Sequence, residues 1–141
     1  MNISIASRLL NVSITIFVLI LTIKSGLLEK EIIVLQLVLS VPFLLISMIT
    51  NAKIVDRGSL KDYYLLNRIT NSIGISLMIN GVGLLVANYT ARYIGVVFFA
   101  VTIFLLSLLL YLDFNKRKLY NEILMIALIF FLGLLPVLIG M

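Results

Sequence analysis

The chain has 141 residues, of which 62% are hydrophobic and only 12% are charged, and its formal net charge is +5. An ordinary globular domain carries about 25% charged residues, so this composition excludes a typical water-soluble domain. The chain contains no Cys and no His, which excludes disulfides, thiolate catalysis and the usual ligands of haem and zinc.

Charged residues are confined to a few short segments, and long uncharged stretches lie between them. The uncharged stretches are 9–23, 32–52, 69–91, 93–112 and 123–141. An α-helix needs about 20 apolar residues to cross the hydrocarbon core of a membrane. The sequence therefore predicts an all-α bundle of five transmembrane helices, in which residues 1–141 form a single integral membrane domain.

The first predicted helix runs over about 5–26. Its uncharged part has 15 residues, which is short for a membrane span. Arg8 and Lys24 compensate, because long basic side chains lie along apolar surface and place their charges at the interface. We interpret the segment as an uncleaved span because Lys24-Ser25-Gly26 does not resemble a signal-peptidase site.

The second predicted helix runs over about 31–52 and contains Pro42 near its centre. Proline removes one backbone hydrogen bond and predicts a kink. Ser40 and Ser47 are nearby hydroxyls that can bond the carbonyl group freed by the proline.

Gly58-Ser59 interrupts the apolar pattern after this helix. Ser59, with Asp62 three residues later, has the spacing of a capping box, which indicates a helix start. We expect a helix near 59–67, either as a short cytoplasmic interfacial helix or as an extension of the third span, 68–89.

The fourth and fifth predicted spans are 93–112 and 118–140. Only a few residues separate span three from span four, and span four from span five. Connections this short join antiparallel helices that are neighbours in the bundle.

The distribution of Lys and Arg predicts the orientation. Eight basic residues fall on the side of the N-terminus, namely Arg8, Lys53, Arg57, Lys61, Arg68, Lys116, Arg117 and Lys118. The three on the other side are Lys24, Lys30 and Arg92. Basic residues favour the cytoplasmic side. We therefore expect a plasma or inner membrane protein with its N-terminus in the cytoplasm and its C-terminus outside.

Polar residues recur at helical spacing within the predicted spans and form a candidate intramembrane seam. Its members are Asn11, Thr15, Gln36, Ser40, Ser76, Asn80 and Thr102. One interpretation is packing, because small and hydroxyl residues let membrane helices approach and amides bond across them. The other is a polar pathway or ligand site lined by the first three helices. Asn80 stands out because a buried amide in hydrocarbon is costly unless it is paired.

The basic residues of the cytoplasmic side are also candidates for contacts with anionic lipid headgroups. They are Lys53, Arg57, Lys61, Arg68, Lys116, Arg117 and Lys118. Anionic lipids attract such clusters, although orientation alone also explains them. With the charge accounted for in this way, we expect no nucleic-acid partner.

No catalytic pattern is evident. Acids are missing from the middle of the predicted spans, which disfavours proton coupling and metal-dependent chemistry. We expect no cofactor and no enzymatic activity, and an interfacial lipid-modifying enzyme ranks third. The leading expectation is a non-enzymatic assembly or accessory subunit of a membrane complex, whose partners are the lipid bilayer and either further copies of itself or another membrane protein. The alternative is a small transporter or channel for a neutral solute or ion, lined by helices one to three.

Overall fold

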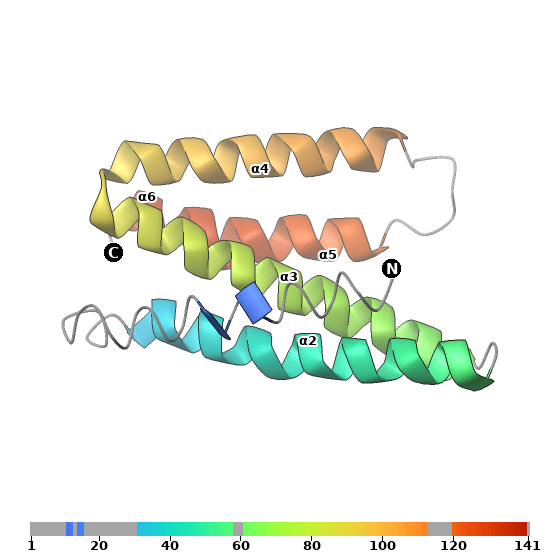
Figure 1. The fold of residues 1–141 in the computed structure, drawn as a ribbon. Helices are drawn as coiled ribbons and strands as arrows, with labels where there is room; N and C mark the ends of the chain where they lie inside the picture. The colour runs from blue at the N-terminus through green and yellow to red at the C-terminus, as the bar shows by residue number, and fades with distance from the viewer. Residues whose placement is uncertain (1–10, 13, 16–30, 58–60, 113–119, 141) are drawn as a thin grey trace.

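The computed structural model describes residues 11–12, 14–15, 31–57, 61–112 and 120–140, and this part of the chain contains helices and no strand. The elements are α2 (Glu31–Arg57), α3 (Lys61–Tyr89), α4 (Arg92–Leu112), α5 (Tyr120–Ile129), the π-helical segment η2 (Phe130–Leu134) and α6 (Leu135–Ile139). Antiparallel connections give the bundle two ends (Figure 1). We call them the Lys61 end, where α2 ends and α3 begins, and the Arg92 end, where α3 ends and α4 begins.

Four helical stretches are long and apolar enough to cross a membrane. They are Ile32–Asp56, Lys61–Tyr89, Arg92–Leu112 and Tyr120–Ile139. For the described residues, the prediction of an all-helical chain with long apolar helices in these regions is confirmed. The predicted first span, 5–26, lies mostly outside the described residues; the described ones, Asn11, Val12, Ile14 and Thr15, are helical.

Helix α2 is longer than predicted and continues through Pro42 to Arg57. Neither serine bonds the carbonyl group that Pro42 leaves free. Ser40 donates to the Leu37 carbonyl oxygen at 2.7 Å, and Ser47 donates to Asn67 on α3.

Helix α3 is one continuous helix of 29 residues. Residues 61–67 therefore extend the third span and do not form a separate helix, while 59 and 60 lie outside the described residues. At about 1.5 Å per residue the helix is about 43 Å long, which exceeds the hydrocarbon thickness of about 30 Å. It runs obliquely relative to α4 and α5 (Figure 1), as expected of a helix longer than the membrane is thick.

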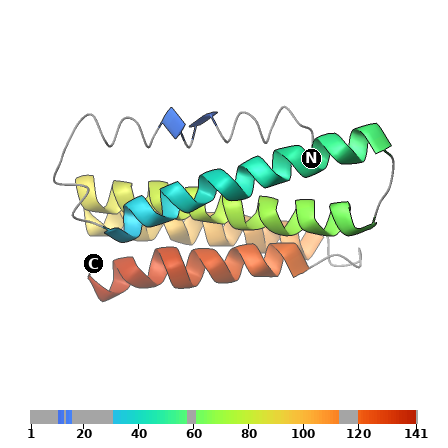
Figure 2. The same ribbon diagram turned by 90° about the horizontal axis from the view of Figure 1, so that it is seen from below.

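Helix α3 is the centre of the bundle, in contact with α2, α4 and α5 (Figures 1 and 2). Its glycines allow this close packing. A Cβ atom at Gly81 would lie 2.5 Å from Leu37 Cδ2 on α2, and one at Gly74 would lie 2.8 Å from Leu44 Cγ. Gly83 packs in the same way against Phe99 of α4. Small residues at such points are how membrane helices approach one another.

The last helical stretch is irregular, which the sequence analysis did not predict. Between α5 and α6 the backbone forms the π-helical turn η2, and the Leu135 N–H bonds the Phe130 carbonyl oxygen five residues earlier. Pro136 follows directly and has no N–H. A proline next to a wider turn leaves carbonyl groups of the preceding residues without their usual helical partners.

The Arg92 end is fastened by a contact between α4 and α6. The Arg92 guanidinium donates to the Val137 carbonyl oxygen at 2.6 Å and also to that of Leu138. Gly140 ends the helix with a φ of 100°, a left-handed conformation that glycine adopts without strain, and its N–H bonds the Pro136 carbonyl oxygen at 3.2 Å. A cation at this position complements the negative end of the helix.

Candidate functional site

Buried polar side chains form two groups along α3. The group nearer the Lys61 end, which we call the Asn67 cluster, consists of Ser47, Thr50 and Asn67. Asn67 Oδ1 accepts from Ser47 Oγ at 2.8 Å and from Thr50 Oγ1 at 3.2 Å. All three residues are buried between α2 and α3. The cluster therefore ties these two helices together by direct side-chain hydrogen bonds.

The second group, which we call the Gln36–Asn80 site, lies nearer the Arg92 end and joins three helices. Gln36 of α2 is 3% exposed and Asn80 of α3 is fully buried. Gln36 Nε2 donates to the Leu132 carbonyl oxygen at 2.8 Å, and Asn80 Nδ2 donates to the Leu128 carbonyl oxygen at 3.1 Å. Both amides therefore reach the last helical stretch at or just before the π-helical turn.

The register of α2 against α3 brings these side chains to one level. Leu37 faces Gly81 and Leu44 faces Gly74, so the helices run antiparallel in step. In this register Gln36 and Asn80 are two residues apart, or about 3 Å along the axes. Ser40 and Ser76 follow about one turn further toward the Lys61 end, and both are fully buried.

The position of Pro136 bears on why Gln36 bonds the Leu132 carbonyl. In a regular α-helix the Leu132 carbonyl would accept from the N–H of residue 136, and Pro136 has none. Gln36 donates to this carbonyl from a neighbouring helix. A side-chain donor is the expected remedy for a helix break in an apolar environment, where no solvent is present to bond the backbone.

In each of the two amides, only the nitrogen makes a hydrogen bond. Gln36 Oε1 and Asn80 Oδ1 are buried, and no group in the described part of the chain donates a hydrogen bond to either. A buried acceptor left unpaired costs about 1–3 kcal/mol. Gly133 is adjacent, since a Cβ atom on it would lie 2.5 Å from Asn80 Oδ1. The arrangement offers two uncharged oxygen acceptors within an apolar bundle.

The other predicted seam residues are placed differently. Asn11 and Thr15 are exposed, and Thr15 donates to the carbonyl oxygen of Asn11. Thr102 is half-buried and donates to the Phe98 carbonyl oxygen of its own helix at 2.8 Å. The structure thus places Gln36, Ser40, Ser76 and Asn80 close together and does not connect the other three to them by a hydrogen bond.

The Asn67 cluster was not among the predicted site residues. Ser47 was noted only as a hydroxyl near Pro42, although Asn67 and Asn71 have the same four-residue spacing as Ser47 and Asn51. Ser47 Oγ lies 3.4 Å from Asn71 Oδ1, so this spacing does reflect a shared face. The sequence signal for this cluster is the four-residue polar spacing of Asn67 and Asn71.

Several predicted headgroup residues lie at the Lys61 end. Lys53 and Lys61 are exposed, and the Lys53 ammonium lies 5.5 Å from the centre of the Tyr63 ring. Arg68 is half-buried; with the Asn121 amide oxygen turned toward it, Arg68 donates from Nε at 2.8 Å and from Nη2 at 3.2 Å. The side chain of Arg57 and residues 116–118 lie outside the described part of the structure.

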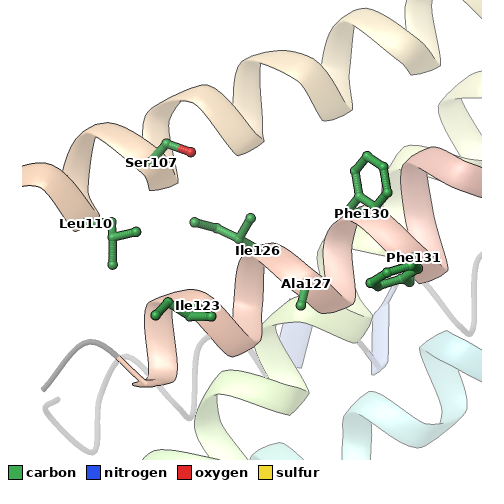
Figure 3. Close-up of a pocket in the computed structure, with 7 residues that line it drawn as sticks. All are labelled: Ser107, Leu110, Ile123, Ile126, Ala127, Phe130 and Phe131. Atoms are coloured by element: carbon green, nitrogen blue, oxygen red, sulfur yellow. The ribbon is translucent and has the colours of Figure 1, made fainter.

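An apolar groove of about 390 Å³ lies between α4 and the last helical stretch. It is lined by Ser107, Leu110, Ile123, Ile126, Ala127, Phe130 and Phe131 (Figure 3). Ser107 is the one hydroxyl residue among apolar side chains, so the groove is suited to an apolar occupant.

Among the described residues, no group of three or more acids could hold a metal ion. The fold defines a class only: an α-helical bundle whose four long apolar helices are compatible with an integral membrane protein. No protein-family model, curated protein or solved structure matches the chain.

Proposed function

We propose that the chain is a small non-enzymatic membrane protein that assembles, with itself or with another membrane protein, as a subunit of a complex. The hydrogen bonds that its polar side chains make between helices support this proposal. The donors of Gln36, Ser47 and Asn80 are engaged with neighbouring helices, and the Thr50 hydroxyl has acceptors both on its own helix and on α3. Interhelical hydrogen bonds of this kind contribute about 0.5–2 kcal/mol each and serve packing.

The observation that carries the proposal is the groove between α4 and the last helical stretch. The buried residues of α4 are Gly95 and Phe99, both in its first half. Its second half lines the groove through Ser107 and Leu110. Small side chains at Ser107 and Ala127 let another helix approach closely. We assign the groove to a transmembrane helix of a second copy, because most oligomers are homo-oligomers.

The orientation belongs to the same proposal. The Lys61 end carries exposed Lys53 and Lys61, and basic residues favour the cytoplasmic side. We therefore place the Lys61 end in the cytoplasm of a cell with a plasma or inner membrane, where these lysines contact anionic headgroups. The C-terminus is then outside.

Counting subunits by single-molecule photobleaching in lipid bilayers tests the assembly. We expect the wild type to form oligomers and Ala127→Trp, which fills the groove, to be monomeric. The matched control is Ala100→Trp, because Ala100 is an exposed residue of α4 that does not line the groove. A wild type that stays monomeric as its density in the bilayer increases would contradict the proposal.

A specific observation favours a second candidate, a transporter or channel for a small neutral solute. The free oxygens of Gln36 and Asn80 are acceptors that packing alone does not use. Light scattering from liposomes exposed to gradients of urea or glycerol tests this candidate. Flux above that of empty liposomes, lost in Asn80→Leu, would support it, and flux equal to that of empty liposomes would exclude it for these solutes.

A further inference from the structure

The two free oxygens of the Gln36–Asn80 site have a fixed orientation. Each amide donates through its nitrogen to a backbone carbonyl, and turning the amide over would place oxygen against oxygen. The oxygens therefore face away from the Leu128 and Leu132 carbonyls. Because those carbonyls are one helical turn, or about 6 Å, apart, both amides converge on the same turn of the last helical stretch.

The chemistry of the site selects the ligand. Two carbonyl oxygens that accept require a partner that donates hydrogen bonds or carries positive charge. The sequence has no acid in 32–52, 69–91 or 123–141, so no carboxylate from these stretches balances a cation at this level. Placing an unbalanced charge in an apolar interior is far more costly than placing a neutral polar molecule there.

We propose that Gln36 Oε1 and Asn80 Oδ1 form a binding site for a small uncharged molecule that donates two hydrogen bonds, of which water is the smallest. Two donors match the two acceptors, and buried water commonly bonds polar groups that the protein leaves unpaired. The site is independent of the assembly proposed above, because no residue of the groove takes part in it. Failure of one proposal therefore leaves the other standing.

A glutamine label would report on this site alone, because Gln36 is the only glutamine in the sequence. Protein made with glutamine labelled with ¹³C at the side-chain carbonyl has a single labelled group, which infrared spectroscopy in bilayers resolves. With water as the probe, we expect the Gln36 carbonyl band at the lower frequency of a hydrogen-bonded carbonyl. We also expect magnetic-resonance transfer from water protons to the Gln36 side-chain amide protons.

The variant Asn80→Leu removes one of the two acceptors. We expect it to move the Gln36 carbonyl band to higher frequency and to abolish the transfer from water. Asn67→Leu is the matched control, because Asn67 is also a buried amide of α3 but belongs to the other cluster. It leaves both signals unchanged.

Three results would overturn the proposal. They are a wild-type band at the frequency of a free carbonyl, a band unaffected by Asn80→Leu, and a band that moves when sodium is replaced by N-methylglucamine, which would identify a cation. If Asn80→Leu does not fold, the wild type alone tests the proposal. Transfer from water protons to the Gln36 amide protons supports it, and the absence of that transfer contradicts it.

Discussion

Gly133 lies where the last helical stretch meets both α3 and α4. A Cβ atom on it would lie 2.5 Å from Asn80 Oδ1 of α3 and would overlap the Phe99 ring of α4. Phe99 and Asn80 are both fully buried. The hydrogen on the glycine Cα is therefore part of the packing around the free amide oxygen.

We expect Gly133→Ala to lower the free energy of unfolding by about 1–3 kcal/mol, as overpacking of a filled interior does. Alanine normally stabilises a helix relative to glycine by about 0.5–1 kcal/mol, so the sign itself is informative. Equilibrium unfolding in mixed micelles measures the change. Adding Asn80→Ala removes one of the two clashes and should reduce the cost of Gly133→Ala; an equal cost in both backgrounds would mean that the contact with Asn80 is unimportant.

At the scale of helices, the last helical stretch depends on its neighbours. Pro136 and the π-helical turn disturb its backbone hydrogen bonds, and Gln36 supplies a donor to the Leu132 carbonyl. The Asn67 cluster separately joins α2 to α3 by hydrogen bonds. The two sets of bonds can be tested separately, because they join different pairs of helices and lie at different levels of the bundle.

The first concerns Gln36 and Pro136. We expect Gln36→Met to lower the free energy of unfolding by about 0.5–2 kcal/mol, the range of interhelical hydrogen bonds in membranes. In a Pro136→Ala background the cost should be smaller, because the restored N–H at position 136 can bond the Leu132 carbonyl. Ser47→Ala combined with Pro136→Ala serves as the control pair and should be additive, since the two residues share no partner. Full additivity of Gln36→Met with Pro136→Ala would show that Gln36 does not compensate for the proline.

The second concerns the Asn67 cluster. Asn67→Leu should lower the free energy of unfolding by about 0.5–2 kcal/mol, because it removes the shared acceptor of Ser47 and Thr50. Asn88→Leu on the same helix should have little effect, since Asn88 is exposed. Unfolding in mixed micelles compares the two variants, and equal effects would show that α2 and α3 do not depend on the cluster for their pairing.

For the molecule as a whole, the sequence predicted where the long described helices lie but did not predict their irregularities. Uncharged stretches locate α3 and α4 well because a membrane span needs a minimum apolar length. Four-residue spacing placed Gln36, Ser40, Ser76 and Asn80 on inward faces. The π-helical turn was not predictable from Pro136 alone, because proline permits several local remedies and the neighbouring helices decide which one is used.

The orientation is also a property of the whole molecule, and it has a direct test. The chain has no Cys, so single cysteines report their own location. Lys61→Cys and Asn88→Cys place thiols at exposed positions near opposite ends of α3. We expect a membrane-impermeant maleimide to label Asn88→Cys from outside intact cells and to label Lys61→Cys only after lysis. The reverse pattern would invert the proposed orientation, and labelling of both from the same side would show that α3 does not cross the membrane.

The bond between Gln36 and the Leu132 carbonyl also has a consequence for biosynthesis. A ribosome delivers α2 and α3 to the membrane before the last helical stretch, so the donors Gln36 and Asn80 precede the carbonyl groups that accept from them. The last stretch therefore enters a membrane in which its two side-chain donors are already in place. Expressed without the rest of the chain, the segment 120–141 would enter the bilayer before any Gln36 donor is present for the Leu132 carbonyl. We expect this segment to insert poorly by itself and to insert better when residues 1–119 are produced in the same cell.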